Sequence, residues 1–452
     1  MAITGHYAVM QGIAMKKQLF VLGLVTVMMA ACAAPEPEPV EPTPGLMAFT
    51  GARLIVGDGD TIEGGTMVIR DGRIEAMGPG DAIDVPPDAT SIDLTGKTIT
   101  PGLINAHGHV NNVRGLEADP AYYTEDHVAY QLGLYARYGV TTVVSLGGDG
   151  PEGIAVRDRE GPDLSHARLR VAGPVITADS PEQAAERVNA AADMNVDFIK
   201  IRVDDNLGVT NKMPREIYQA VIETAHARDL KLTAHLYYLE DAKGLLEAGA
   251  DFVAHSVRDL DVDDELIGLL TDRNVCVCPT LMREVSTYVY EERPEWFDDP
   301  FFLKDADPAV LAALEDPERQ EGYRNSSSAQ TYKVQLDTAK KNLKMLADAG
   351  VRIAMGTDTG PAARFQGYFE HGELDLMVDA GLTPMQAIVA ATGDAAACLD
   401  LDDVGTLAAG KQADFVVYGA NPAADISNSR SIESVWIAGN AVPGVVPSIG
   451  AD

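Results

Sequence analysis

The sequence predicts an α/β protein: a (β/α)8 TIM barrel with a small β-sandwich built from both chain ends. Three observations carry this prediction. Eight strand-then-helix units follow one another in the middle of the chain, alternating apolar runs with tight turns occur near both ends, and the composition suits a large buried core. Hydrophobic residues make up 46% of the 452 residues and charged residues 23%. These values are ordinary for globular proteins and exclude fibrous and wholly disordered classes.

The chain is strongly acidic. It has 35 Lys and Arg against 68 Asp and Glu, which gives a formal net charge of −33. A surface with this charge repels phosphate backbones, so nucleic acid is not expected as a partner. The four cysteines are too few for a disulfide scaffold.

Residues 1–45 are expected to lie outside the fold. Lys16 and Lys17 precede an apolar run at 19–34, which is shorter than the ~20 residues of a bilayer-spanning helix and predicts a signal peptide. The run ends in Met-Ala-Ala-Cys32, which resembles the lipobox of bacterial lipoproteins, and a Pro/Glu-rich tether follows. We expect export and a lipid anchor on Cys32 in the envelope of a Gram-negative bacterium, at the outer membrane or in the periplasm. Ordinary secretory cleavage is the alternative.

Both ends of the folded part are rich in short strands. Residues 46–97 contain alternating runs at 66–70 and 73–77 joined by Asp71-Gly72, a strong hairpin signal. Residues 404–445 repeat the pattern, with strands expected at 414–418 and 434–438. We therefore expect the two ends to form the β-sandwich domain together.

Residues 98–403 are expected to form the barrel. Predicted strands lie at 98–105, 139–146, 169–176, 197–203, 231–237, 251–257, 274–281 and 351–357. The clearest helical patterns lie at 181–195, 214–229, 239–248, 262–273 and 329–349. The active site of such a barrel lies at the C-terminal ends of its strands. A doubly wound open sheet is the alternative, but no G-x-G-x-x-G follows the first strand.

Residues 282–328 interrupt the alternation of strands and helices. This inserted stretch contains many aromatic and acidic residues. It is expected to form either a lid over the substrate or a helical flap packed on the barrel rim.

Residues that bind metals occur at the ends of the predicted strands. His107 and His109 are two positions apart, so on an extended chain they point the same way and can bind one ion. The other candidates are Lys200, His235, His255 and Asp358, each at or near the C-terminal end of a strand. Their common position on one face favours a metal site over six unrelated structural roles.

Other histidines and cysteines are interpreted as structural. His127, His166 and His226 are expected on helices or loops, and His371 at a solvated helix position. Cys276, Cys278 and Cys398 are expected to be buried thiols that act as small hydrophobic residues.

The motifs together resemble the amidohydrolase superfamily. The similarity rests on Pro101 to His109 with its His-x-His, on the two later histidines, on Gly356-Thr357-Asp358, and on the closing run from Gly405 to Val417. Within that superfamily the pattern resembles imidazolonepropionase-like hydrolases. Lys200 favours the branch of prolidase-type dipeptidases that use a carboxylated lysine.

The resemblance implies a site with two divalent metal ions, zinc being the expected metal. His107, His109 and Asp358 would bind the first ion, and His235 and His255 the second. A CO2-derived carbamate on Lys200 would bridge both, and a metal-bridging hydroxide would attack the substrate. The alternative for Lys200 is an ion pair with acidic residues at the barrel rim.

Four residues are given roles in catalysis or substrate binding. Asp358 would accept a proton and pass it to the leaving amine. Tyr237, two positions beyond His235, would donate to the carbonyl oxygen or to a substrate carboxylate. Arg202 and Arg258 are candidates to bind that carboxylate. For Arg202, Tyr237 and Arg258, a rim ion pair or a core tyrosine is the alternative.

The sequence thus predicts a metal-dependent hydrolase of amide C–N bonds in dipeptides or N-acyl amino acids. The expected partner is a small-molecule substrate with a carboxylate, membrane contact is through the lipid anchor only, and a homo-oligomer is left open. One alternative is lactonase, carbamate or organophosphate hydrolase or deaminase activity on the same scaffold. A non-catalytic envelope lipoprotein is the other.

Overall fold

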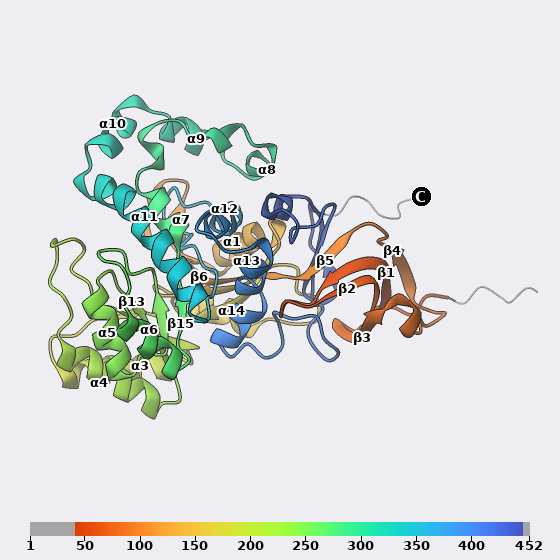
Figure 1. Ribbon diagram of the computed structural model, residues 1–452, viewed down its shortest axis with the longest axis horizontal. Helices are drawn as coiled ribbons and strands as arrows, with labels where there is room; N and C mark the ends of the chain where they lie inside the picture. Colours follow the sequence, from red (N-terminus) through yellow and green to blue (C-terminus); the bar gives the residue numbers. More distant parts are fainter. Residues whose placement is uncertain (1–40, 446–452) are drawn as a thin grey trace, which may run out of the picture. The chain divides into compact units, whose positions relative to one another are not determined.

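Parallel strands in the middle of the chain form two sheets in the computed structural model, which describes residues 41–445 (Figure 1). Every strand pair in both sheets is parallel and follows chain order, as expected where a helix connects each strand to the next. One sheet contains β6 (Leu103–Gly108), β9 (Val140–Ser145) and β10 (Arg168–Val171). The other contains β11 (Val175–Ile176), β12 (Phe198–Arg202), β13 (Lys231–His235), β14 (Phe252–Ala254) and β15 (Cys276–Cys278).

Two of the predicted strands differ from their expected form. The strand expected at 169–176 is divided into β10 and β11 by a turn at Gly173, whose φ is 67°. The segment expected as a strand at 351–357 forms only isolated bridges, yet it bonds in two directions. Ala354 N–H donates to Val277 O of β15, and Met355 O accepts from Ala106 N–H of β6. The α/β class is confirmed.

Helices alternate with these strands, and several of them bury one apolar face. In α4, for example, Ile217, Val221 and Ala225 recur at four-residue spacing and are buried. Side chains of Thr124, Ser180, Asp263, Ser326 and Thr383 cap the amino-terminal ends of five helices. The helices are α1 (Glu125–Arg137), α2 (Pro151–Asp158), α3 (Pro181–Asp193), α4 (Arg215–Ala227), α5 (Leu239–Ala248), α6 (Asp264–Asp272), α11 (Ser327–Asp348), α12 (Tyr368–Asp379), α13 (Pro384–Ala390) and α14 (Gly393–Cys398).

Strands from both chain ends share a third sheet. Its order is β18-β17-β16-β5-β1-β2-β3, with β4 paired to β1. The hairpin predicted at Asp71-Gly72 joins β2 to β3, and β16 pairs with β5 antiparallel. The folding of this sheet into a sandwich stays a prediction. The strands are β1 (Leu46–Ile55), β2 (Thr61–Arg70), β3 (Arg73–Pro79), β4 (Thr90–Asp93), β5 (Thr98–Pro101), β16 (Phe415–Tyr418), β17 (Ile432–Ile437) and β18 (Asn440–Ala441).

The inserted segment at 282–328 is helical. It contains α7 (Leu281–Ser286), α8 (Pro300–Leu303), α9 (Pro308–Leu314) and α10 (Pro317–Asn325), and the last three lie at the top of Figure 1. Its aromatic side chains pack on the chain just before and within α12: the Phe302 ring centroid is 4.8 Å from those of Phe365 and Tyr368. Whether the segment acts as a lid or as a flap stays a prediction.

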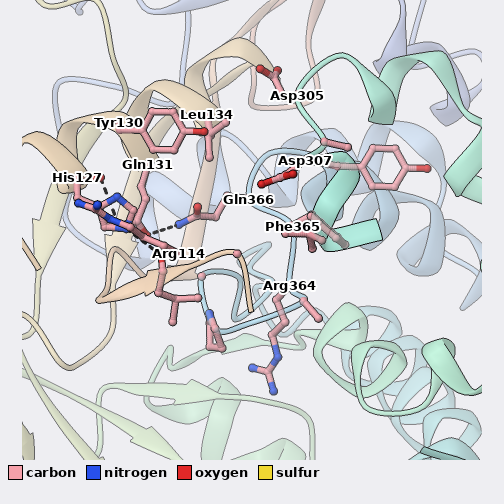
Figure 2. A pocket seen from close by; sticks show the side chains of 18 of the residues that line it. Arg114, His127, Tyr130, Gln131, Leu134, Asp305, Asp307, Arg364, Phe365 and Gln366 are labelled. Carbon is pink, nitrogen blue, oxygen red and sulfur yellow. Dashed lines mark hydrogen bonds between the residues drawn. The ribbon is translucent and has the colours of Figure 1, made fainter. Parts of the chain in front are cut away.

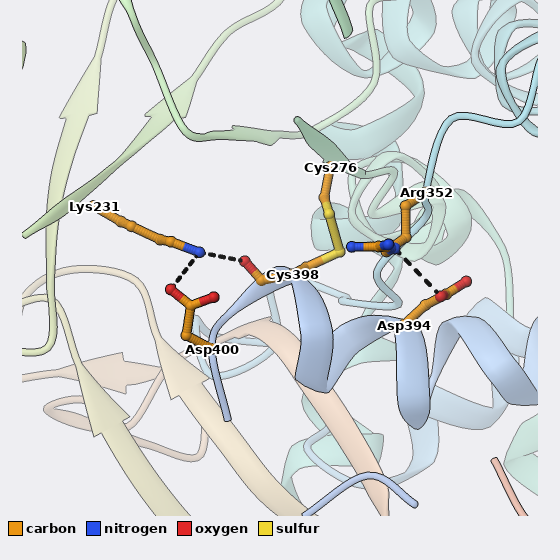
Figure 3. The surroundings of a disulfide bond; sticks show 6 residues. All are labelled: Lys231, Cys276, Arg352, Asp394, Cys398 and Asp400. Atoms are coloured by element: carbon orange, nitrogen blue, oxygen red, sulfur yellow. Dashed lines mark hydrogen bonds and ion pairs between the residues drawn. A yellow bond between two sulfur atoms is a disulfide. The ribbon is translucent and has the colours of Figure 1, made fainter. Parts of the chain in front are cut away.

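The expectation of thiols at Cys276 and Cys398 is wrong. These two residues form a disulfide between β15 and the end of α14 (Figure 3). A separation of 122 residues hides this pairing in the sequence. Lys231 lies beside it, donating to Cys398 O at 3.3 Å and pairing with Asp400. Cys278 is a buried free thiol, as predicted.

The solvated position expected for His371 is also wrong. Its side chain is fully buried within α12 and lies 2.8 Å from Tyr138 O through Nε2 and 2.9 Å from Ser429 Oγ through Nδ1. The short polar runs around His371 in the sequence did not indicate that other segments bury this side chain of α12. Separately, between residues 41 and 445 no helix has both the length and the apolar character needed to cross a bilayer.

Candidate metal centre

The first three predicted ligands come together at the ends of two strands. His107 and His109 lie on and just beyond β6, and Asp358 follows the segment that bonds to β6. One ligand atom from each residue lies within 4.8 Å of the others. Asp358 Oδ1 is 2.8 Å from His109 Nε2 and 3.6 Å from His107 Nε2. These residues can bind one divalent metal ion.

Lys200 lies beside this group and is buried. Its Nζ is 3.4 Å from His107 Nε2, the only hydrogen-bond partner it has within residues 41–445. Burial lowers the pKa of Lys200 from 10.5 to about 8, because an ammonium loses its hydration there. The side chain therefore lacks the acidic partner that a rim ion pair would give it.

His235 and His255 complete the cluster. The His255 ring centroid is 4.2 Å from that of His235 and 4.6 Å from that of His107. Burial lowers the pKa of His107 and His255 well below 6.5, and that of His235 to about 3. All three are therefore neutral, which is the form that binds metal.

Three of the four histidines in the cluster have one ring nitrogen within hydrogen-bond distance of another protein group. His109 Nδ1 is 3.1 Å from Gly147 O, His235 Nε2 is 2.8 Å from Asp204 Oδ2, and His255 Nδ1 is 2.7 Å from Thr280 Oγ1. Such partners orient metal-binding imidazoles. In His107, Nδ1 is buried without a hydrogen-bond partner in the described chain. This donor set, imidazole nitrogens with a carboxylate, fits zinc and similar divalent ions.

The backbone at the cluster is strained. His255, Thr280 and Asp358 have positive φ angles of 81°, 49° and 57°, which side chains other than glycine rarely adopt. At Asp358 the turn lets the N–H donate to His107 O at 2.6 Å. Strain of this kind concentrates at functional sites because the surrounding fold must maintain it.

A buried network of hydrogen bonds connects α12 to the backbone of His107. Glu370 of α12 accepts hydrogen bonds on Oε1 from Asn105, Thr357 and Thr359 at 2.6–2.8 Å. Asn105 Oδ1 in turn accepts from His107 N–H at 3.0 Å. This network ties β6 to the segment that ends in Asp358. Asn105 and Glu370 were not among the predicted site residues, because no spacing rule in the sequence connects them.

Two charged residues near Asp358 were also absent from the predicted site residues. Arg364 Nη1 donates to Asp358 Oδ2 at 2.5 Å, and Arg283 Nε lies 4.0 Å from the same oxygen. Burial opposes ionisation of Asp358, but Arg364 and the neighbouring histidines hold its pKa well below the usual value. Asp358 is therefore a carboxylate. Arg283 and Arg364 follow strand ends without a motif that singles them out.

The three predicted substrate contacts have different surroundings. Arg202 is exposed, and its Nε donates to Asp204 Oδ1 at 2.8 Å. Tyr237 and Arg258 are both buried, and Arg258 Cζ lies 4.8 Å from the centroid of the Tyr237 ring. Glu284 Oε1 is 3.1 Å from Arg258 Nε. Their roles toward a substrate stay predictions.

A cavity of about 510 Å³ lies near the centre, although none of the six candidate ligands lines it (Figure 2). Its walls come from α1, from the inserted segment and from the loop at 360–366, and they include Tyr130, Asp307 and Phe365. Two wall residues contact candidate metal ligands: Arg364 contacts Asp358, and Gln366 Nε2 donates to His109 O at 2.9 Å. Arg364 and Gln366 therefore connect the cavity wall to the cluster.

Comparisons with known proteins agree with this geometry. The sequence profile of the amidohydrolase family matches residues 98–442. An uncharacterized protein of Mycobacterium tuberculosis is 26% identical over 343 residues, covering 72% of this chain and 80% of that protein.

Solved structures show the same similarity. A Bifidobacterium longum protein provisionally assigned as a prolidase is 26% identical, with a TM-score of 0.71 and coverage of 91% of this chain and 98% of that one. A Xaa-Pro dipeptidase with methionine bound in its active site is 21% identical, with a TM-score of 0.71 and coverage of 88% and 99%. Since the family profile spans most of the chain and includes all the clustered residues, the chain belongs to the amidohydrolase family.

Proposed function

We propose that the protein is a binuclear metal-dependent hydrolase that cleaves amide C–N bonds in dipeptides or N-acyl amino acids. The observation that carries this proposal is the convergence of His107, His109 and Asp358 with a buried lysine and two further neutral histidines. The dipeptidase and prolidase named among the similar structures support the same reaction class.

The proposed scaffold is the (β/α)8 barrel. Its support is the bonding of residues 351–357 in two directions, to β15 through Val277 and to β6 through Ala106. These bonds connect the last strand of one parallel sheet to the first strand of the other. Closure of the strands into a ring would bring all their C-terminal ends to one mouth.

The proposed metal set has two parts. His107, His109 and Asp358 would bind one ion and His235 and His255 the other, with Lys200 between them as a carbamate. The metals would supply an activated water and polarise the scissile carbonyl. Lys200 suits its role because burial favours the neutral amine, which is the form that adds CO2.

The chain's own residues would move the proton and orient the substrate. Asp358 is ionised and 2.5 Å from Arg364, so it can accept a proton and deliver it to the leaving amine nitrogen. Tyr237 is buried against Arg258, which fixes its ring while leaving the hydroxyl as a donor for the substrate.

Two buried arginines support a substrate with a carboxylate. Arg258 and Arg283 share one acidic partner, Glu284. Nε of Arg258 lies 3.1 Å from Glu284 Oε1, but Nη2 of Arg258 and Nε of Arg283 are buried and have no hydrogen-bond partner within residues 41–445. Leaving such donors unpaired is costly, and a carboxylate would satisfy them bidentately. Arg202 is a weaker candidate because Asp204 already occupies its Nε.

Turnover of matched substrates tests this proposal. The full, zinc-loaded protein is assayed with a panel of dipeptides and N-acyl amino acids, with their C-terminal amides, and with lactones. We expect the free acids to be cleaved about 10²-fold faster in kcat/KM than the amides. Equal turnover of acids and amides would reject the carboxylate, and hydrolysis of lactones alone would reject the amide reaction.

A substitution locates the carboxylate. Arg258→Met keeps most of the side-chain length without its donors, and we expect it to abolish the preference for acids over amides. Arg293→Met is the matched control, since Arg293 pairs with Asp298 and Glu315 on the surface of the inserted segment. An unchanged preference in folded Arg258→Met would remove this arginine from the substrate site.

We also propose that the protein is exported and anchored by lipid. The Cys276–Cys398 disulfide supports export, because structural disulfides persist in oxidising compartments. Cys32 and the predicted signal peptide lie outside the described residues.

A further inference from the structure

Asp204 connects a proposed metal ligand to an arginine. It follows β12, is 5% exposed, and accepts hydrogen bonds on both carboxylate oxygens. Oδ2 is 2.8 Å from His235 Nε2, while Oδ1 accepts from Arg202 Nε at 2.8 Å and from Asn206 N–H at 3.2 Å. These partners hold the carboxylate in one orientation toward the imidazole.

The strand register creates this contact. In the parallel pair of β12 and β13, Arg202 lies opposite His235. Val203 N–H donates to His235 O at 3.1 Å, so the strands stay bonded up to the site. Asp204 lies at a bend two residues beyond Arg202, and its carboxylate is next to the imidazole of His235.

The contact determines which nitrogen of His235 carries the proton. An ionised carboxylate only accepts hydrogen bonds, so the hydrogen between Asp204 and His235 must be on Nε2. A neutral imidazole protonated on Nε2 has its lone pair on Nδ1. His109 has the opposite arrangement, because the Gly147 carbonyl requires the proton on Nδ1 and leaves Nε2 for the metal. Thr280 beside His255 can donate or accept, so it imposes neither form.

We infer that Asp204 is a positioning residue that commits His235 to binding its metal ion through Nδ1. This inference rests on the proposed function, in which His235 is a ligand of the second ion. It also gives Arg202 a different role from the predicted one: Arg202 fixes Asp204, and its ion pair acts on the metal site through that carboxylate.

Zinc binding to the metal-free full-length protein tests the inference without any substrate. Asp204→Asn keeps the shape of the side chain but replaces one acceptor oxygen with an NH2 group and removes the charge. An amide can donate to Nε2 and so stabilise the wrong imidazole form. We expect the second zinc ion to bind about 10- to 100-fold more weakly, the usual cost of losing such a partner. Competition with a chromophoric chelator measures both affinities.

Asp205→Asn is the matched control. Asp205 is the adjacent carboxylate, but it bonds to Tyr238 Oη at 2.8 Å rather than to a metal-binding histidine. We expect this variant to bind two zinc ions as tightly as the unaltered protein. Equal weakening in both variants would attribute the effect to lost negative charge and overturn the positioning role.

A spectroscopic measurement covers the case in which Asp204→Asn fails to fold. Long-range proton–nitrogen correlation of the 15N-histidine-labelled, metal-free protein reports which ring nitrogen carries the proton, and His235→Gln assigns the signal. We expect the proton of His235 on Nε2, and a proton on Nδ1 would overturn the inference. The failures are distinguishable: an unaltered protein that binds fewer than two zinc ions rejects the binuclear proposal. Two tight ions in Asp204→Asn reject only the role of Asp204.

Discussion

Reducing the Cys276–Cys398 disulfide is expected to destabilise the protein strongly. The bond closes a loop of 122 residues. In the chain-entropy relation a loop of this length lowers the entropy of the unfolded state by about 16 cal/mol/K, which is about 5 kcal/mol at 25 °C. Both cysteines are buried, and the relation treats the folded state as unchanged when the bond opens. The loss therefore arises from the greater freedom of the unfolded chain.

Urea unfolding with and without dithiothreitol measures this effect. Thiol titration of the denatured protein confirms reduction by a rise of two free thiols. We expect the unfolding midpoint to fall on reduction, and to fall similarly in the double variant Cys276→Ala, Cys398→Ala, in which dithiothreitol then has no further effect. Two additional thiols with an unchanged midpoint would refute the entropic argument.

Three other predictions concern single side chains. Lys200→Ala should lose bound metal by elemental analysis, and short carboxylic acids should restore part of it; full metal content without them would exclude a bridging lysine. His371 has a pKa lowered by burial to about 3, so stability should fall by up to about 1.4 kcal/mol per pH unit below pH 6.5. His371→Gln should show a smaller slope in urea unfolding, and an identical slope would contradict this. Cys32→Ala should release the protein from membrane fractions of its native host, and unchanged fractionation would exclude the anchor.

The sign of the pH effect follows from the protonation of each state. Between pH 3 and 6.5 the unfolded histidine binds a proton that the folded one does not, so acid favours unfolding. In the fold the neutral ring donates from Nε2 to Tyr138 O and accepts at Nδ1 from Ser429. The positively charged Arg430 and Lys304 further oppose protonation.

Local patterns predicted the α/β class and the three residues that come together as a candidate metal site. The His-x-His at 107–109 places two imidazoles on one side of an extended chain. The motif also lies at the end of a predicted strand, and the sequence alone shows where that strand ends. Asp358 could be found for the same reason. The two-residue spacing of Lys200, Arg202 and Asp204, which runs from β12 to just beyond its end, could have drawn attention to Asp204 as a neighbour of His235.

Contacts between distant segments could not be predicted in this way. The disulfide joins residues on either side of the inserted segment, and the burial of His371 depends on Ser429 near the chain end. Glu370 looks like an ordinary helical acid until Asn105 and Thr357 surround it. Each of these depends on packing across the fold, which periodicity along one strand or helix does not encode.

The sheet shared by the two chain ends can be completed only late in synthesis. β5 lies between β1 and β16, so one of its edges has no partner until residues 415–418 have been made. An unpaired edge attracts other strands and promotes aggregation. The risk of aggregation is therefore lowest if the nascent chain stays unfolded until its carboxyl end has been made. A chain that crosses a membrane in an extended state also stays unfolded in this way. Truncation before β16 should yield inclusion bodies even though every proposed metal ligand is present.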